Sequence, residues 1–534
     1  MTHTVEILVL LLVVLAAAAW IAGKLKIPPS ILLVITGVGL ALVPSLPAIE
    51  IEPEIVLLLV LPPIIYSSSV AMSWREFRFN LRPIALLAVG CVVFTTVAVA
   101  ASMHYLLGTP WQIGFVIGAI VSPPDAVAPL SIARRLKLPK RILIILEGEG
   151  LANDATALIL YRFAVAAVST GAFSPGQATG TFAAIVAGEI VWGVGAGWLM
   201  LRLRKWARDP RIEITLSIVT PFVAYWPPEQ AGGSGVLATV VAGLYISWNG
   251  QRLISAATRL QGIFFWDLFI YLIEGMVFLI TGLQARTLIE RIGHSPSHDL
   301  LATAGVVCAV VILARFIWVF PAIYIPRWIS PPLRKRDPSP PWQATSVIAF
   351  TGIRGVVSLA AALAIPFTTE AGEPFPGRDL ILFLTFSVIL VTLVGQGLLL
   401  PTVIRWLGLS NAGARERQQE RTEEREARRL ALEAVIARLE EIRTERGLTK
   451  EELRPLHMHH NDRLKHVVHQ TDGDDGHRKT AELHDEIELL LIGAEREEIN
   501  KLFRDGKLTD EARRRIEREL DLREADLANQ TSET

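Results

Sequence analysis

Charged residues are scarce in the first three quarters of this chain and abundant in the remainder. Residues 1–410 contain 28 Lys and Arg and 21 Asp and Glu, about 12% of the positions. Residues 411–534 contain 24 Lys and Arg and 31 Asp and Glu, about 44% of the positions. A soluble protein needs a polar surface around its core, and so few charges over so long a stretch cannot supply one. We therefore predict a membrane domain over 1–410 and a water-exposed, charged helical tail over 411–534, which excludes a soluble enzyme.

The apolar runs of the first domain have the length of membrane-spanning helices. A bilayer core about 30 Å thick requires about 20 apolar residues per helix. Charged and Pro- or Gly-rich breaks separate thirteen candidate spans: 5–22, 27–45, 52–71, 83–107, 111–133, 142–169, 179–201, 212–226, 234–248, 261–284, 300–326, 342–366 and 380–404. The sequence thus predicts an all-α polytopic membrane protein with about thirteen transmembrane helices.

Basic residues alternate between the loops on the two sides of these spans. Loops after odd-numbered spans carry 22 Lys and Arg, and the opposite loops carry 3. Basic loops stay in the cytoplasm, so the N-terminus is expected outside the cell membrane and the tail in the cytoplasm. The formal net charge of +0 gives no indication of nucleic-acid binding.

The fifth span is interrupted by prolines beside a carboxylate. Pro123 and Pro124 lack the N–H groups that a continuous helix requires, and Asp125 follows them directly. Carbonyls freed in a membrane need another partner, which a cavity holding cations or water provides. A proline kink with Asp125 capping the second half-helix is the structural alternative.

The sixth span contains four residues of interest on one helix. Helical spacing places Glu149 with Asn153 and Gly150 with Asp154, so Gly150 leaves space beside the Asp154 carboxylate. Burial favours the protonated form of an isolated carboxylate, as proton exchange requires. The structural alternative makes Asp154 the partner of an intramembrane arginine.

The twelfth span has glycines on both sides of a buried arginine. Gly352 and Gly355 flank Arg354 and predict a second broken helix, seven spans after the first. Two broken helices at corresponding positions are typical of inverted-repeat transporters. Each buried arginine needs a carboxylate. We expect Arg354 to pair with Glu149 and Arg315 with Glu274, mainly as architecture.

These motifs resemble those of monovalent cation:proton antiporters, specifically the sodium/proton exchanger type with an Asn-Asp pair. The resemblance rests on Ser-Pro-Pro-Asp at 122–125, Glu-Gly-Leu-Ala-Asn-Asp at 149–154, Gly-Ile-Arg-Gly at 352–355 and Leu-Pro-Pro-Ile-Ile-Tyr at 61–66, and covers residues 5 to about 405. It implies an inverted-repeat fold with two crossed broken helices, a homodimer and an elevator-like motion. It also implies that Asp154 carries cation and proton and that Asp125 and Asn153 shape the site.

The expected function is electroneutral exchange of a monovalent cation, sodium first, for a proton. A potassium/proton exchanger and a cation channel gated by the tail are the alternatives. Family members often carry Ser at the position of Gly150, and some carry an acidic residue at the position of Ser67. These two differences leave the choice of transported cation open among sodium, lithium and potassium. No cofactor, no enzymatic activity and no metal beyond the transported cation are expected. The His-rich section, 457–484, is interpreted as a solvated linker.

Overall fold

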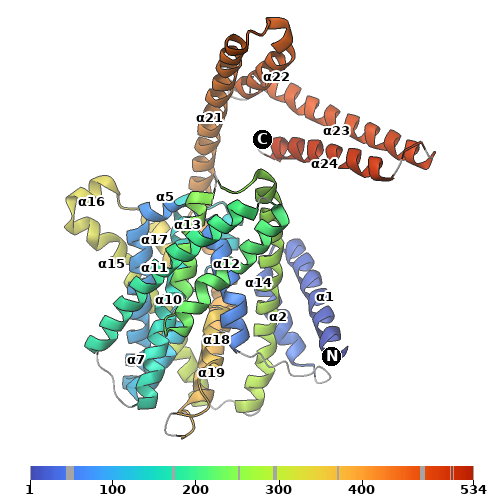
Figure 1. Cartoon of the computed structure of the whole chain (residues 1–534). Helices are drawn as coiled ribbons and strands as arrows, with labels where there is room; N and C mark the ends of the chain where they lie inside the picture. The colour runs from blue at the N-terminus through green and yellow to red at the C-terminus, as the bar shows by residue number, and fades with distance from the viewer. Residues whose placement is uncertain are drawn as a thin grey trace. The chain divides into compact units, whose positions relative to one another are not determined.

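The computed structural model describes residues 2–43, 53–170, 175–207, 209–250, 253–292, 298–369, 372–469, 475–505, 507–508 and 510–532. It divides into two units, Met1–Ala414 and Arg415–Thr534, which are described separately. Both units are helical (Figure 1). In the described ranges the extended structure is limited to one isolated bridge, between Thr368 and Pro374.

In its described residues, the first unit consists of helices and three π-helical segments. In chain order these are α1 (Thr2–Leu25), α2 (Pro29–Ala41), α3 (Pro53–Ile55), η1 (Val56–Val60), α4 (Leu61–Ala71), α5 (Trp74–Phe79), α6 (Leu81–Ala85), η2 (Leu86–Cys91), α7 (Val92–Leu107), α8 (Trp111–Val121), α9 (Val127–Arg135), α10 (Lys140–Thr170), α11 (Pro175–Ala207), α12 (Pro210–Gln230), α13 (Val236–Asn249), α14 (Ala256–Ile292), α15 (His298–Ile329), α16 (Pro331–Arg336), α17 (Trp342–Phe350), α18 (Val356–Leu363), α19 (Arg378–Leu390), η4 (Val391–Gln396) and α20 (Gly397–Trp406).

Seven helical stretches in the described residues are long and apolar enough to cross a membrane. They are Glu6–Leu25, Leu81–Leu107, Lys140–Thr170, Ala178–Ala207, Ala257–Thr287, Asp299–Ile329 and Arg378–Trp406. Shorter apolar helices include α2, α8 and α13. The expectation of a polytopic all-helical membrane unit is confirmed, whereas the count of thirteen and the inverted repeats stay predictions.

Both spans that the sequence predicts to be broken are interrupted. The fifth span becomes α8 and α9, which are separated by residues 122–126. The twelfth becomes α17 and α18, which are separated by residues 351–355. The breaks follow from local chemistry, because two prolines end the first helix and two glycines border the second gap.

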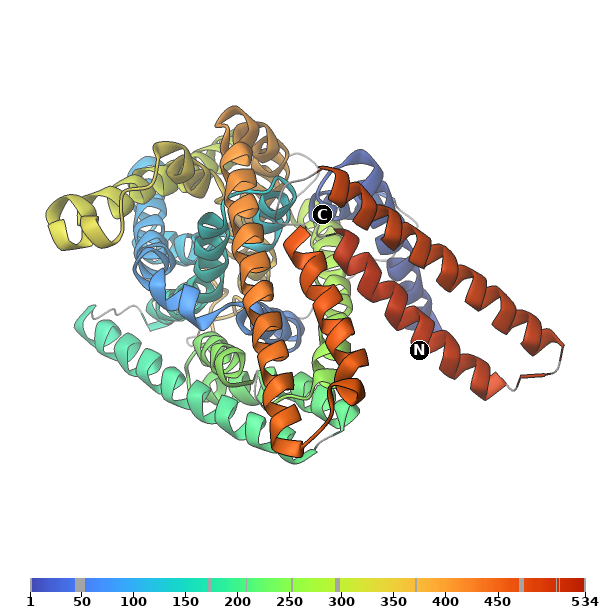
Figure 2. The ribbon, with the colours of Figure 1, turned by 90° about the horizontal axis from the view of Figure 1, so that it is seen from above.

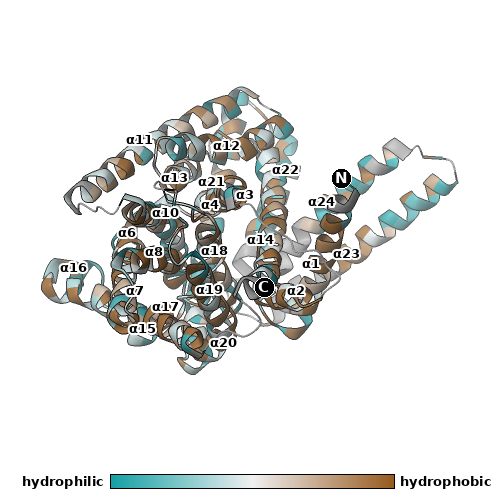
Figure 3. Ribbon diagram, turned by 90° about the horizontal axis from the view of Figure 1, so that it is seen from below, coloured by the Kyte–Doolittle hydropathy of each residue, from teal (hydrophilic) through white to brown (hydrophobic). Residues whose placement is uncertain are grey.

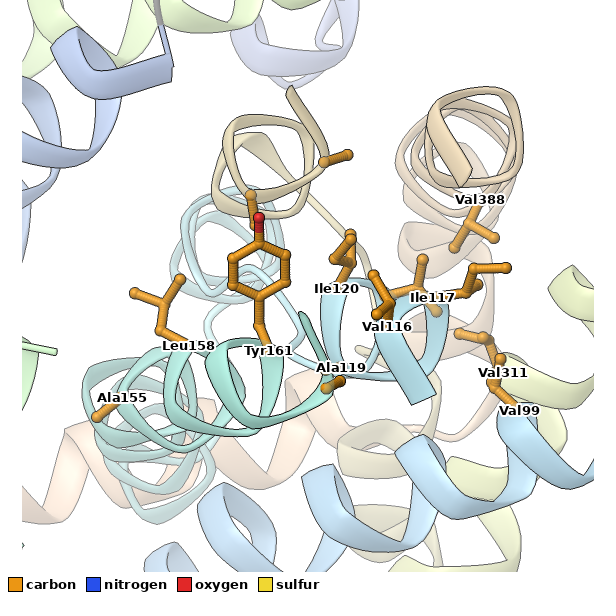
Figure 4. Packing of buried hydrophobic residues seen from close by; sticks show 14 of the residues in the cluster. Val99, Val116, Ile117, Ala119, Ile120, Ala155, Leu158, Tyr161, Val311 and Val388 are labelled. Carbon is orange, nitrogen blue, oxygen red and sulfur yellow. The ribbon is translucent and has the colours of Figure 1, made fainter. Parts of the chain in front are cut away.

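Buried aliphatic side chains hold the interrupted helices against their neighbours. Figure 4 shows Ile117 and Ile120 of α8 packed among side chains of other helices, including Leu158 of α10 and Val388 of α19. A second cluster joins α2, α14 and α9, with Ile31, Leu279 and Ile132 among its members. The breaks therefore lie inside a packed bundle.

Apolar residues also cover outward-facing sides of the helices in the first unit. In the view from above (Figure 2), α11 lies along the outer edge of the first unit, and only 33% of its apolar stretch is buried inside the protein. Figure 3 shows brown, hydrophobic residues on the helices of this unit, α15 among them. An outward-facing apolar surface of this kind suits contact with lipid.

The second unit continues α21 (Leu409–Arg446) and contains α22 (Lys450–His469), α23 (Asp475–Arg504) and α24 (Asp510–Ser532). Helices α23 and α24 enclose a small core of Ile492, Ile499 and Leu520. Arg496 pairs across these helices with Asp521 at 2.7 Å and with Glu524 at 2.7 Å. The second unit begins at Arg415, and the assignment of 411–534 as a separate charged tail stays a prediction.

Histidines of the second unit are described only in part. His457 Nε2 and Glu440 Oε1 are 2.9 Å apart, and this hydrogen bond holds the pKa of Glu440 below its usual value. The side chains of His466, His469, His477 and His484 lie outside the described residues. In the part of the chain that the structure describes, no group of three His, Cys, Asp or Glu could hold a metal ion.

Candidate functional site

The first helix break brings Asp125 against the second one. The Asp125 N–H donates to the Ile353 carbonyl at 2.7 Å, so the two interrupted segments are joined backbone to backbone. Asp125 Oδ1 accepts a hydrogen bond from the Val127 N–H at 3.1 Å, at the start of α9. Asp125 Oδ2 is buried and has no hydrogen-bond partner among the described residues. One carboxylate oxygen therefore caps a half-helix, as in the structural alternative, and the other remains available.

Arg354 lies in the second break and is 1% exposed. Its Nε donates to the Val121 carbonyl at 2.9 Å, and its Nη2 reaches the Ser122 carbonyl at 3.5 Å. The Arg354 N–H donates to Thr392 Oγ1 at 3.0 Å. The carbonyls at the end of α8 have left the regular helical pattern, and the guanidinium of Arg354 now satisfies them.

The buried ion pair is Glu149–Arg315. Arg315 Nη1 and Nη2 lie 2.5 Å and 2.8 Å from the two Glu149 oxygens, and both side chains are 2% exposed. Arg315 also donates to the Ile348 carbonyl of α17, from Nε at 3.1 Å and from Nη2 at 3.0 Å. This fork-to-fork geometry is the strong form of an arginine–carboxylate contact.

Both expected ion pairs, Glu149–Arg354 and Glu274–Arg315, are therefore wrong. Arg315 lies inside the regular helix α15, whose carbonyls are already hydrogen-bonded, so its guanidinium requires a carboxylate. Arg354 lies in an unwound segment near free carbonyls and is satisfied by them. Glu149 faces Arg315, and Glu274 is left without either arginine.

Helix α10 carries Asn153 and Asp154 past the first break. Asn153 is fully buried, and its Nδ2 donates to the Pro124 carbonyl at 2.6 Å, which holds α10 against the break. Gly150 is required here because a Cβ at this position would overlap the Ala126 side chain. The absence of a side chain at Gly150 thus allows the first break to pack against α10. Gly150 also lines the cavity together with Asp154, as the sequence predicts.

Asp154 and Asp125 line the same cavity, which has a volume of about 260 Å³. Its charged lining residues come from four segments: Asp125, Arg134, Glu147, Asp154 and Glu274. Arg134 Nη2 lies 3.3 Å from Glu147 Oε1, so these two charges are paired. A cavity with unpaired carboxylates and the ends of half-helices is suited to a monovalent cation or a proton.

Glu189 of α11 is a buried carboxylate for which the sequence by itself indicates no partner. Its carboxylate accepts hydrogen bonds from Ser234 N at 2.6 Å, Leu237 N at 3.0 Å and Ala238 N at 3.3 Å. These groups lie at or just before the first turn of α13, where N–H groups lack helical acceptors. Glu189 of α11 is therefore a cap supplied by another helix, and the Gly-Gly-Ser-Gly stretch before α13 was the only local signal.

Asp337 was also missed by sequence reasoning. Its carboxylate pairs with Arg82 at 2.8 Å, Arg141 at 2.6 Å and Arg327 at 2.7 Å. These arginines belong to α6, α10 and α15, so one loop carboxylate joins three helix ends. The signal was a single acidic residue within a basic loop, and loop charges alone do not reveal such a junction.

A polytopic membrane bundle with two interrupted helices that meet beside a buried carboxylate defines the class of secondary transporters. The family model described as "Sodium/hydrogen exchanger, transmembrane" matches residues 9–406. An uncharacterized Na⁺/H⁺ exchanger of Mycobacterium tuberculosis is 35% identical over 534 residues, covering 97% of this chain and 96% of the relative. This chain belongs to the sodium/hydrogen exchanger family.

Two further likenesses extend this result. The sodium, potassium, lithium and rubidium/H⁺ antiporter of Bacillus subtilis is 35% identical over 390 residues, covering 70% of this chain and 57% of the relative. The sodium proton antiporter MjNhaP1 of Methanocaldococcus jannaschii has a similar fold, with a TM-score of 0.60 and 19% identity, over 76% of this chain and 99% of MjNhaP1.

Proposed function

We propose that this protein exchanges a monovalent cation, sodium first, for a proton across the cell membrane. The observation that carries the proposal is the position of Asp154, which lines a cavity beside two helix breaks joined at Asp125 and Ile353. Asp154 binds either the cation or the proton, and Asp125 and Asn153 shape the site around it. One exchangeable carboxylate at this point, with an amide at Asn153, favours one proton per cation and electroneutral exchange.

The geometry supports alternating access by a carboxylate that is neutral in both loaded states. A bare carboxylate in the membrane is unfavourable, whereas its sodium and proton forms carry no net charge. The buried Glu149–Arg315 pair and the carbonyl contacts of Arg354 fix the segments around the site. The site then moves as one body, in the elevator-like manner that the family resemblance implies, within a homodimer.

The orientation follows from the distribution of basic residues. The cavity includes Arg134 and Glu147, near the end of α10 that begins at Lys140. With the N-terminus outside, this end of the cavity faces the cytoplasm. The charged tail then lies in the cytoplasm, where we assign it a regulatory role.

The test is cation-dependent proton movement in vesicles containing the purified protein and an internal pH-sensitive dye. Asp154→Asn keeps the shape of the side chain and removes its exchangeable proton, so exchange is expected to vanish. Asp299→Asn is the matched control, because Asp299 is an exposed carboxylate in the first turn of α15, outside the cavity lining. Substantial exchange by Asp154→Asn, at equal protein level, would exclude Asp154 as the carrier.

The same vesicles test whether proton and cation share one site. Competition requires the apparent KM for sodium to rise as the pH falls, approaching about tenfold per pH unit. Maximal rate at saturating sodium is expected to change much less. A KM that stays constant while the maximal rate collapses would contradict a shared site.

Potassium/proton exchange is the second candidate. It is favoured by the likeness to the Bacillus subtilis antiporter, whose name includes sodium, potassium, lithium and rubidium. Vesicle assays with each chloride salt separate the two candidates by their apparent KM values.

A further inference from the structure

Glu274 is a carboxylate in the middle of the long helix α14, away from both helix ends. It lines the cavity that contains Asp154 and Asp125. Its expected partner, Arg315, is held by Glu149. Across the described ranges Glu274 forms no salt bridge, and the nearby cation, Arg134, is paired with Glu147. An unpaired carboxylate at this depth of a membrane protein is unfavourable unless it has a function.

Helix α14 belongs to a different part of the bundle from α10. It packs closely along α2, where the Gly37 Cβ position would come within 2.9 Å of the Gly282 Cα. In Figures 1 and 3, α18 lies between α10 and α14. Glu274 and Asp154 therefore approach the cavity from separate helices.

Acidic residues outnumber basic residues in the described lining of the cavity. Asp125, Asp154 and Glu147 are acidic, and Arg134 is the one basic residue of the described lining. Because Arg134 pairs with Glu147, the remaining three carboxylates make the cavity attractive to cations. Charges of one sign in a confined cleft raise the local concentration of the opposite ion.

We propose that Glu274 is a second cation-binding residue, which holds the entering cation before it reaches Asp154. This inference rests on the proposed antiport function and adds a ligand to the same cavity. Glu274 affects cation capture, whereas Asp154 carries out the exchange. Loss of Glu274 therefore weakens the apparent affinity for sodium. It leaves the turnover rate at saturating sodium nearly unchanged.

The test compares Glu274→Gln, Glu274→Asp and Asp299→Asn in vesicles. Glu274→Gln is expected to raise the apparent KM for sodium about tenfold and to change the maximal rate by less than about twofold. Glu274→Asp retains the charge and is expected to lie close to the native protein. Asp299→Asn removes an equal charge from an exposed position at the start of α15 and is expected to have no effect. An unchanged KM in Glu274→Gln, or a lost maximal rate, would overturn the inference.

Sodium-dependent thermal stabilisation in detergent gives a second readout that does not require transport. N-methylglucamine chloride at equal concentration controls for ionic strength. The sodium concentration at half-maximal stabilisation is expected to rise about tenfold in Glu274→Gln. If the native protein does not move protons but shows this difference, the antiport proposal fails and the binding inference stands. If native protein and variant respond alike, the binding inference fails.

Discussion

Replacing Arg315 with methionine is expected to be among the most damaging single changes in the membrane unit. It leaves Glu149, 2% exposed, as an uncompensated charge, and the Ile348 carbonyl loses two donated hydrogen bonds. Breaking a buried pair by removing one partner costs about 3–5 kcal/mol. We therefore expect Arg315→Met to lower the free energy of unfolding by about that amount, and Glu149→Gln to lower it by a similar amount.

The assay is a double-mutant cycle measured by SDS-induced unfolding in mixed micelles. The double variant, Glu149→Gln with Arg315→Met, removes both charges together. Coupled residues show interaction energies of about 0.5–3 kcal/mol. Because the contact is bidentate and buried, we expect a coupling near the upper end of that range.

A second cycle between Glu149 and Arg354 provides the matched control. Arg354 contacts carbonyls at Val121 and Ser122 rather than the Glu149 carboxylate. Its coupling to Glu149 is therefore expected to be clearly smaller than that of the Glu149–Arg315 pair, because the two side chains make no direct contact. A larger coupling for Glu149–Arg354 than for Glu149–Arg315 would refute the assigned pairing.

Two further changes test the supporting structure. Glu189→Ala removes the acceptor of several backbone N–H groups at the start of α13. It is expected to lower the free energy of unfolding by at least about 3 kcal/mol in the same assay. Glu189→Gln retains an acceptor oxygen and is expected to lower it by less. Native stability in Glu189→Ala would show that the cap is dispensable. Gly355→Ala places a Cβ within 2.6 Å of Asp125 Oδ2 and is therefore expected to displace that carboxylate. The displacement is expected to weaken the apparent affinity for sodium at least about tenfold in the vesicle assay. Gly305→Ala is its control, since nothing lies within 4 Å, and equal affinity in the two variants would count against a role for Asp125 in the site.

The candidate site was predictable where its chemistry is local. Consecutive prolines end a helix wherever they occur, so Pro123 and Pro124 already indicated the first break. Gly150 and Asp154 lie about one turn apart on any helix, so the sequence already predicted that Gly150 leaves space beside the Asp154 carboxylate. The structure adds that the space at Gly150 is used by Ala126, a residue of the other segment.

Partners between distant segments were not predictable in this way. The sequence showed that Arg315 and Arg354 both need acceptors, but it did not show which acceptors each would meet. That choice depends on helix packing and on whether carbonyls near each arginine are already hydrogen-bonded. The same reason explains why Asp337 and its three arginines escaped notice, since they come together only when α6, α10 and α15 pack.

The sequence by itself determined that the first domain is a helical membrane unit and that two of its spans are broken. Apolar length, charge scarcity and proline placement act within one segment and require no knowledge of its neighbours. Tertiary structure alone decided that the breaks meet at Asp125 and Ile353, that Glu149 holds Arg315, and that Glu274 lines the cavity without a salt bridge to any residue the structure describes. These contacts join residues more than a hundred positions apart, and the energy of a buried charge depends on which side chains and carbonyls surround it once the helices are packed.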